Sequence, residues 1–146
     1  MPVPCGQRLF LYGTLLAGAR TPMARALEAR VSDQAAATVP GRLVAIPAVE
    51  GWYPALIQGG PGRVNGTICT LRPDRAFLAS LDRYEGGQYR REFVWATRTG
   101  GLPERALAYV WQAPLPPGAR PIAGGDFLEW IARSGKRPFG LVEETG

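Results

Sequence analysis

Residues that break regular structure are spread along the whole chain and limit what it can fold into. Glycine (19 residues) and proline (14 residues) together make up more than a fifth of the 146 residues. Glycine readily adopts backbone conformations that other residues avoid, and proline fixes φ and lacks an N–H donor, so both end helices and strands. The sequence therefore favours many turns and short strands over a helix bundle.

The hydrophobic pattern predicts one α+β domain over residues 1–146, with a core at about 8–134. Helices are expected where apolar residues recur at helical spacing, and strands where short apolar or β-branched runs lie between turn residues. Residues 33–38 are small and polar, which predicts a connection. The proline in 52–57 predicts an edge strand. The expected helices are 21–30, 73–85 and 126–133, and the expected strands are 8–12, 39–46, 52–57, 64–71, 89–99 and 104–112. The strands are expected to be mostly antiparallel. This pattern suits a strongly curved sheet or a small barrel with the helices packed outside it.

The charge pattern and apolar content bear on partners and location. The net charge is +5, carried almost entirely by scattered arginines, since Lys136 is the only lysine. Because no run of five basic residues occurs, nucleic-acid binding is not expected, although a folded basic face stays open. No apolar run approaches the roughly 20 residues that span a bilayer, and the N-terminus lacks signal-peptide features. We expect a cytoplasmic protein without a membrane partner; the oligomeric state is not predicted.

The chain contains no histidine. This excludes Ser-His-Asp and Cys-His catalysis and removes the commonest transition-metal ligand. The two cysteines, Cys5 and Cys69, are far apart and form neither a metal motif nor a disulfide framework; Cys69 is expected to be a core thiol. We therefore expect no metal and no cofactor, and proton transfer must fall to Asp, Glu, Lys, Tyr or Cys.

Glu85 is the leading candidate for that role. The helix expected over 73–85 should end at Gly86 and Gly87, which offer a left-handed cap. A carboxylate there faces the negative end of the helix dipole, and with Tyr84 and Tyr89 nearby its pKa should rise toward the range useful for proton transfer. The alternative is an ordinary solvated glutamate. Other acids compete: Asp82 with a polar-face or capping role, Asp126 as an N-cap, Glu92 in the hairpin, and Glu50.

Further candidates lie on the first strand and on the hairpin. Gly13, directly after the first strand, allows a sharp turn whose backbone N–H groups could hold an anion; a plain tight turn is the alternative. Tyr109 is expected to point its hydroxyl into a pocket or to be a core aromatic. Arg91 shares strand parity with Tyr89 and is expected to face the pocket and attract a carboxylate, or else to be a solvated arginine.

Seven short motifs, in order, resemble the gamma-glutamylcyclotransferase-like superfamily, and most closely its small branch that includes the gamma-glutamylamine cyclotransferases. Each motif is weak alone, but their order and spacing extend over about residues 8–130. Phe127 stands where the family usually has tryptophan. The motifs are LFLYGTL at 9–15, GRL at 41–43, YPAL at 53–56, VNGT at 64–67, LDRYEG at 81–86 with YRR at 89–91, AYVW at 108–111 and GDF at 125–127.

The resemblance implies a six-stranded, barrel-like sheet and a reaction that releases 5-oxoproline and an amine or amino acid from a γ-glutamyl compound. It implies that Glu85 is the general acid/base, and that the loop of Tyr12, Gly13, Thr14 and Leu15 holds the substrate with backbone N–H groups. The alternative on the same fold is a non-catalytic module that binds a small molecule or peptide. The leaving group is not identified; the variable segments 47–53 and 113–124 are expected to line its side of the pocket.

Overall fold

The computed structural model describes residues 7–13, 22–49, 51–72 and 74–136. These residues form three helices and eight strands, and the α+β prediction is confirmed. The helices are α1 (Pro22–Arg30), α2 (Arg75–Glu85) and α3 (Phe127–Ser134). The strands are β1 (Gln7–Leu11), β2 (Val31–Pro40), β3 (Arg42–Ala48), β4 (Gly51–Ile57), β5 (Arg63–Leu71), β6 (Tyr89–Arg98), β7 (Pro103–Trp111) and β8 (Arg120–Pro121).

One sheet contains all eight strands, in the order β1-β5-β2-β6-β7-β4-β3-β8. An additional parallel pairing of β1 with β7, at Leu9 and Leu107, closes β1, β5, β2, β6 and β7 into a ring. The remaining strands β4, β3 and β8 continue from β7 as an open extension. The sheet is mostly antiparallel and barrel-like, as predicted, with two more strands than the six expected.

The first of the extra strands is β2, which begins directly after α1. Its segment 33–38 was expected to be a connection, and this was wrong: it pairs residue by residue with β5, from Asp33 opposite Thr70 to Thr38 opposite Asn65. Apart from Thr38, the segment lacks the β-branched residues that usually mark a strand. Ala37 is buried in the barrel interior, where a small ring of strands leaves room for little more than a methyl group.

The second correction concerns β4, which is not an edge strand. It lies between β3, with which it pairs along its whole length, and β7. β4 pairs with β7 at Leu56 and Val110, and this pairing does not include Pro54. Proline is therefore tolerated there, because no β7 acceptor requires its missing N–H.

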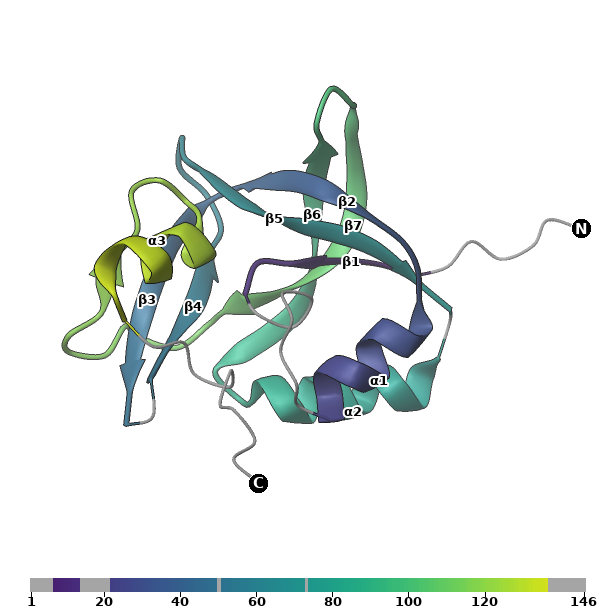
Figure 1. Cartoon of the computed structure of the whole chain (residues 1–146), viewed down its shortest axis with the longest axis horizontal. Helices are drawn as coiled ribbons and strands as arrows, with labels where there is room; N and C mark the ends of the chain where they lie inside the picture. Colours follow the sequence, from purple (N-terminus) through teal and green to yellow (C-terminus); the bar gives the residue numbers. More distant parts are fainter. Residues whose placement is uncertain (1–6, 14–21, 50, 73, 137–146) are drawn as a thin grey trace, which may run out of the picture.

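Apolar side chains pack into three clusters, and the two largest hold the ring of strands together. The ring interior contains Phe10, Ile68 and several alanines, and α3 closes this cluster with Phe127 and Trp130. The outer face of the ring packs against α1 and α2 through a second cluster. Figure 1 shows α1 and α2 side by side next to β1, and α3 at the other end of the molecule beside β3 and β4.

The end of β1 lies unusually close to β5. A Cβ at Gly66 would stand 2.4 Å from the carbonyl oxygen of Leu11 and 2.7 Å from the ring of Phe10. Only glycine leaves this space, so Gly66 lets the end of β1 lie close against β5 at the point where the chain continues into Tyr12 and Gly13. No helix among the described residues is long and apolar enough to cross a membrane.

Candidate active site

Local signals determine where α2 starts and ends, and thereby where Glu85 stands. Asp74 is the N-cap: its side chain accepts a hydrogen bond from the Phe77 backbone N–H at 2.9 Å, although a first-turn position was expected. Phe77 and Leu81 are buried against the barrel. At the other end Gly86 has φ 98° and ψ 169°, so it has the positive φ predicted but turns the chain into an extended path rather than a left-handed cap. Glu85 is therefore the last residue of α2.

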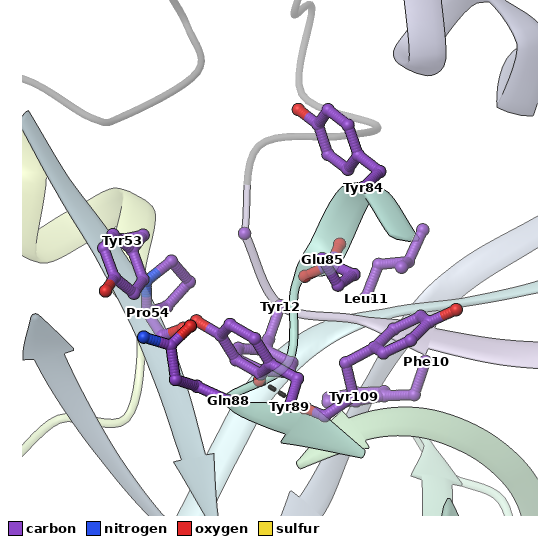
Figure 2. A pocket seen from close by; sticks show the side chains of 11 residues that line it. Phe10, Leu11, Tyr12, Tyr53, Pro54, Tyr84, Glu85, Gln88, Tyr89 and Tyr109 are labelled. Carbon is purple, nitrogen blue, oxygen red and sulfur yellow. Dashed lines mark hydrogen bonds between the residues drawn. The ribbon is translucent and has the colours of Figure 1, made fainter. Parts of the chain in front are cut away.

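A cavity of about 310 Å³ opens beside this helix end. In Figure 2 the Glu85 carboxylate lies in the middle of the labelled side chains, between Tyr84 on one side and Tyr12 on the other. Among the described residues the lining is mainly aromatic and apolar, and Glu85 is the one carboxylate in it. The lining residues are Phe10, Leu11, Tyr12, Gly13, Tyr53, Pro54, Tyr84, Glu85, Gln88, Tyr89 and Tyr109.

The aromatic surroundings change the proton affinity of Glu85. Burial, and secondarily the negative charge of Asp82 one helical turn earlier, raise the pKa of Glu85 from about 4.5 to about 7. The upward direction was predicted, but from the helix dipole and the neighbouring tyrosines rather than from burial and Asp82. A carboxyl group with a pKa near 7 can both accept and donate a proton at neutral pH.

The opposite wall of the cavity is held by the hydroxyl of Tyr12. This hydroxyl donates a hydrogen bond to the backbone carbonyl of Tyr109 on β7 and accepts one from the backbone N–H of Leu56 on β4 at 3.2 Å. It thus bridges the two strands. Tyr89 fixes the same region by donating to the Pro54 carbonyl at 2.5 Å. Burial raises the pKa of both tyrosines, so both hydroxyls stay protonated and act as structural donors.

A second, smaller cavity of about 290 Å³ lies beyond Tyr89 and Tyr109, which line both cavities. It is lined also by Asp82, Arg90 and Arg91. The Tyr109 hydroxyl donates to Asp82 Oδ1 at 2.6 Å, and Arg91 Nη1 lies 3.5 Å from the same oxygen. Arg91 is therefore paired with Asp82 and lines the smaller cavity rather than the larger one, and its expected attraction of a substrate carboxylate stays a prediction.

The described residues offer no cluster of three or more Cys, Asp or Glu side chains that could hold a metal ion. Cys69 is fully buried under α1 and α2, as predicted for a core thiol. Burial, with a smaller effect from Asp33, raises the pKa of this thiol to about 12, so it is a poor nucleophile at neutral pH.

A comparison with protein families shows which family the chain belongs to. A family described as gamma-glutamyl cyclotransferase, AIG2-like, matches residues 9–129. The chain belongs to this family. A comparison with curated proteins finds no match.

Solved structures resemble this AIG2-like protein over most of its length. A protein from Arabidopsis thaliana is 25% identical, with a TM-score of 0.63 over 92% of this chain and 78% of that one. An AIG2-like protein from Mus musculus is 22% identical, with a TM-score of 0.58 over 78% of this chain and 86% of that one. A structure described as gamma-glutamyl cyclotransferase is 18% identical, with a TM-score of 0.59 over 97% and 92%. These likenesses bear out the fold expected from the sequence motifs.

The cavity of this AIG2-like protein brings together Glu85, Tyr12, Gly13 and Tyr109, all of which the sequence singled out. Thr14 and Leu15, also predicted, lie outside the described residues, as does Glu50. The roles of all these residues stay predictions. Residues missed as site candidates are Phe10, Leu11, Pro54 and Gln88. The YPAL and LFLYGTL motifs contained three of them, whereas no sequence signal distinguished Gln88.

Proposed function

We propose that this protein is a γ-glutamyl cyclotransferase-type enzyme that releases 5-oxoproline and an amine or amino acid from a γ-glutamyl compound, with Glu85 as general acid/base. The observation that carries the proposal is the carboxyl group of Glu85, with a pKa of about 7, inside a cavity whose described lining is mainly apolar. Family membership supports the same reaction class. The reaction needs no cofactor, because the substrate supplies its own nucleophile.

In the proposed reaction the Glu85 carboxylate first takes a proton from the substrate's α-ammonium group. Such a group has a pKa of about 8, so a carboxylate whose pKa is raised to about 7 accepts the proton at little cost. The freed amine attacks the γ-carbonyl carbon, forming a carbon–nitrogen bond and a tetrahedral oxyanion. The oxyanion then collapses and the γ-amide bond breaks as Glu85 returns its proton to the departing nitrogen. The ring nitrogen still carries two hydrogens and passes one of them, through the regenerated Glu85 carboxylate, to the released amine.

The described residues have parts in holding the substrate. Attack is intramolecular, so keeping the glutamyl chain folded supplies much of the rate acceleration. The chain at Tyr12 and Gly13 borders the cavity opposite Glu85, and its N–H groups are proposed to hold the α-carboxylate or the oxyanion. Thr14 and Leu15 are proposed to continue this contact. The ring of Tyr109, fixed through its hydroxyl, forms the cavity wall against the glutamyl chain.

The test is turnover of a panel of γ-glutamyl amino acids and γ-glutamyl-amines, measured as 5-oxoproline release. Glu85→Gln keeps the size of the side chain but removes the proton carrier, so kcat should fall by about 10²–10⁴-fold. Glu28→Gln, an exposed glutamate on α1, makes the same change elsewhere and should leave kcat unaltered. Undiminished activity of Glu85→Gln would remove Glu85 from the mechanism. Binding of γ-glutamyl compounds without any turnover would favour the non-catalytic alternative.

The panel also addresses the leaving group. Tyr53 and Pro54 line the cavity, whereas residues 113–124 do not. We therefore propose that the 47–53 segment and its neighbour Pro54, rather than 113–124, contact the leaving group. A crystal soaked with 5-oxoproline should show the ligand between Glu85 and Gly13, with the leaving-group side open toward Tyr53.

A further inference from the structure

Asp82 stands one helical turn before Glu85 on the same face of α2, and two side chains from the β6–β7 hairpin meet at it. Its Oδ1 atom accepts a hydrogen bond from the Tyr109 hydroxyl on β7 at 2.6 Å. The Arg91 Nη1 atom on β6 lies 3.5 Å from the same oxygen, and this nitrogen is inaccessible to solvent and makes no hydrogen bond. The Asp82 carboxylate is thus the point at which the end of α2 is attached to the β6–β7 hairpin.

The attachment extends through Tyr109 to the far wall of the larger cavity. The Tyr109 side chain binds Asp82, while its backbone carbonyl accepts the hydrogen bond from Tyr12. The tyrosine therefore connects the helix that carries Glu85 with the chain segment that leads to Gly13. A shift of Asp82 would alter the distance between the two walls that must hold the substrate.

Among the described residues, few titratable groups act on Glu85 from the surrounding elements. Asp82 on α2 is the charged side chain whose field raises its pKa. Tyr12 after β1, Tyr89 on β6 and Tyr109 on β7 interact with it as neutral phenols. Because these phenols stay protonated at neutral pH, Asp82 is the one group among them whose charge can act on Glu85.

We propose that Asp82 is a positioning residue for Glu85: held by Tyr109 and Arg91, its carboxylate fixes the last turn of α2 on the β6–β7 hairpin and faces Glu85 with a second negative charge. This inference rests on the proposed function, since it assigns Asp82 a part in the proton transfer. Arg91 also acts on Glu85 in this proposal, because its positive charge offsets part of the field that Asp82 exerts on Glu85.

The test is a titration of the Glu85 carboxyl by carbon NMR on the full chain without substrate, which needs no turnover. Asp82→Asn removes the negative charge and should lower the midpoint by on the order of one pH unit. Arg91→Met leaves Asp82 uncompensated and should move the midpoint upward. Asp74→Asn makes the same change at the other end of α2, where asparagine also caps a helix, and should leave the midpoint in place.

The opposite shifts of the Glu85 midpoint expected in Asp82→Asn and Arg91→Met distinguish this proposal from a general destabilisation of the fold. If Asp82 and Arg91 only held the fold together, both variants would expose Glu85 to water and lower its midpoint together; that result, or an unchanged midpoint in Asp82→Asn, would overturn the proposal.

In active protein, the acidic limb of the kcat/KM profile should shift in the same directions as the NMR midpoints. An absence of turnover in the unmodified protein would instead count against the proposed function and leave the NMR result to judge Asp82. Should Asp82→Asn fail to fold, Arg91→Met and Tyr109→Phe still decide: Tyr109→Phe keeps the Asp82 charge and should reduce kcat with little change in midpoint.

Discussion

Two cavities share the wall formed by Tyr89 and Tyr109, and they hold their charges in different ways. The larger contains Glu85 among aromatic side chains, and none of its described lining residues is an arginine or lysine. The smaller contains Asp82 together with Arg90 and Arg91. Burial without a counter-ion favours the neutral form of a carboxyl group. One turn of helix thus presents two carboxyl groups to two environments, and the cavity around Glu85 raises the pKa of this group to about 7.

The largest expected effect tests whether the cavity destabilises the charged form of Glu85. Its pKa is raised from about 4.5 to about 7, so the unfolded chain releases this proton first. The stability that the raised pKa provides is complete below pH 4.5 and is lost as the pH rises to 7. Glu85→Gln removes the charge and should therefore be more stable than the unmodified protein at pH 8, by up to about 3 kcal/mol, and equally stable at pH 4.

Urea unfolding at both pH values measures this difference, with Glu28→Gln as the matched control. The contrast between the two cavities would break down if Glu85→Gln changed stability equally at pH 4 and pH 8. A gain confined to high pH would also fit the usual opposition between stability and a reactive site.

The second prediction concerns the shape of the larger cavity. A Cβ at Gly13 would lie 3.2 Å from the Pro54 side chain across the wall, closer than side chains normally approach. Gly13→Ala should displace the substrate-holding chain and lower kcat/KM by on the order of tenfold, with little change in folding. Gly101→Ala, in the β6–β7 turn, meets its nearest atom at 3.4 Å and is the control. Equal activity of the two variants would argue that Gly13 does not shape the site.

The smallest expected effect compares the two tyrosines of the shared wall. Tyr109 donates to the charged Asp82 carboxylate, whereas Tyr89 donates to the neutral Pro54 carbonyl. Hydrogen bonds to charged groups contribute more, but Asp82 is partly exposed, so Tyr109→Phe should cost about 1.5 kcal/mol and Tyr89→Phe about 1 kcal/mol. Thermal unfolding measures both. A larger loss for Tyr89→Phe would show that the wall depends mainly on β4 and not on the attachment to α2.

The parts of the site that were predictable follow from local rules. The apolar stripe of α2, the glycine at its end and the absence of histidine singled out Glu85, and the motifs around Tyr12 and Glu85 pointed to the family that the comparison then showed. The parts that were missed depend on residues distant in sequence. Arg91 was expected to face the larger cavity because it shares strand parity with Tyr89. Parity predicts which face of the sheet a side chain lies on, but not which residues pack against that face.

The sequence by itself determined the three helices and six of the eight strands among the described residues, the end of α2 at Gly86 and the choice of Glu85. These follow from the sequence because caps, periodicity and residue chemistry act over a few neighbouring positions. Only the tertiary structure decided that β1 closes a ring with β7, that β2 begins directly after α1, and that Asp82 pairs with Arg91. The hydroxyl of Tyr12 reaches a carbonyl 97 residues further along the chain, and no local pattern encodes such a contact. The proton affinity of Glu85 belongs to this second group, because it arises from burial that exists only once distant strands and α2 enclose the same cavity.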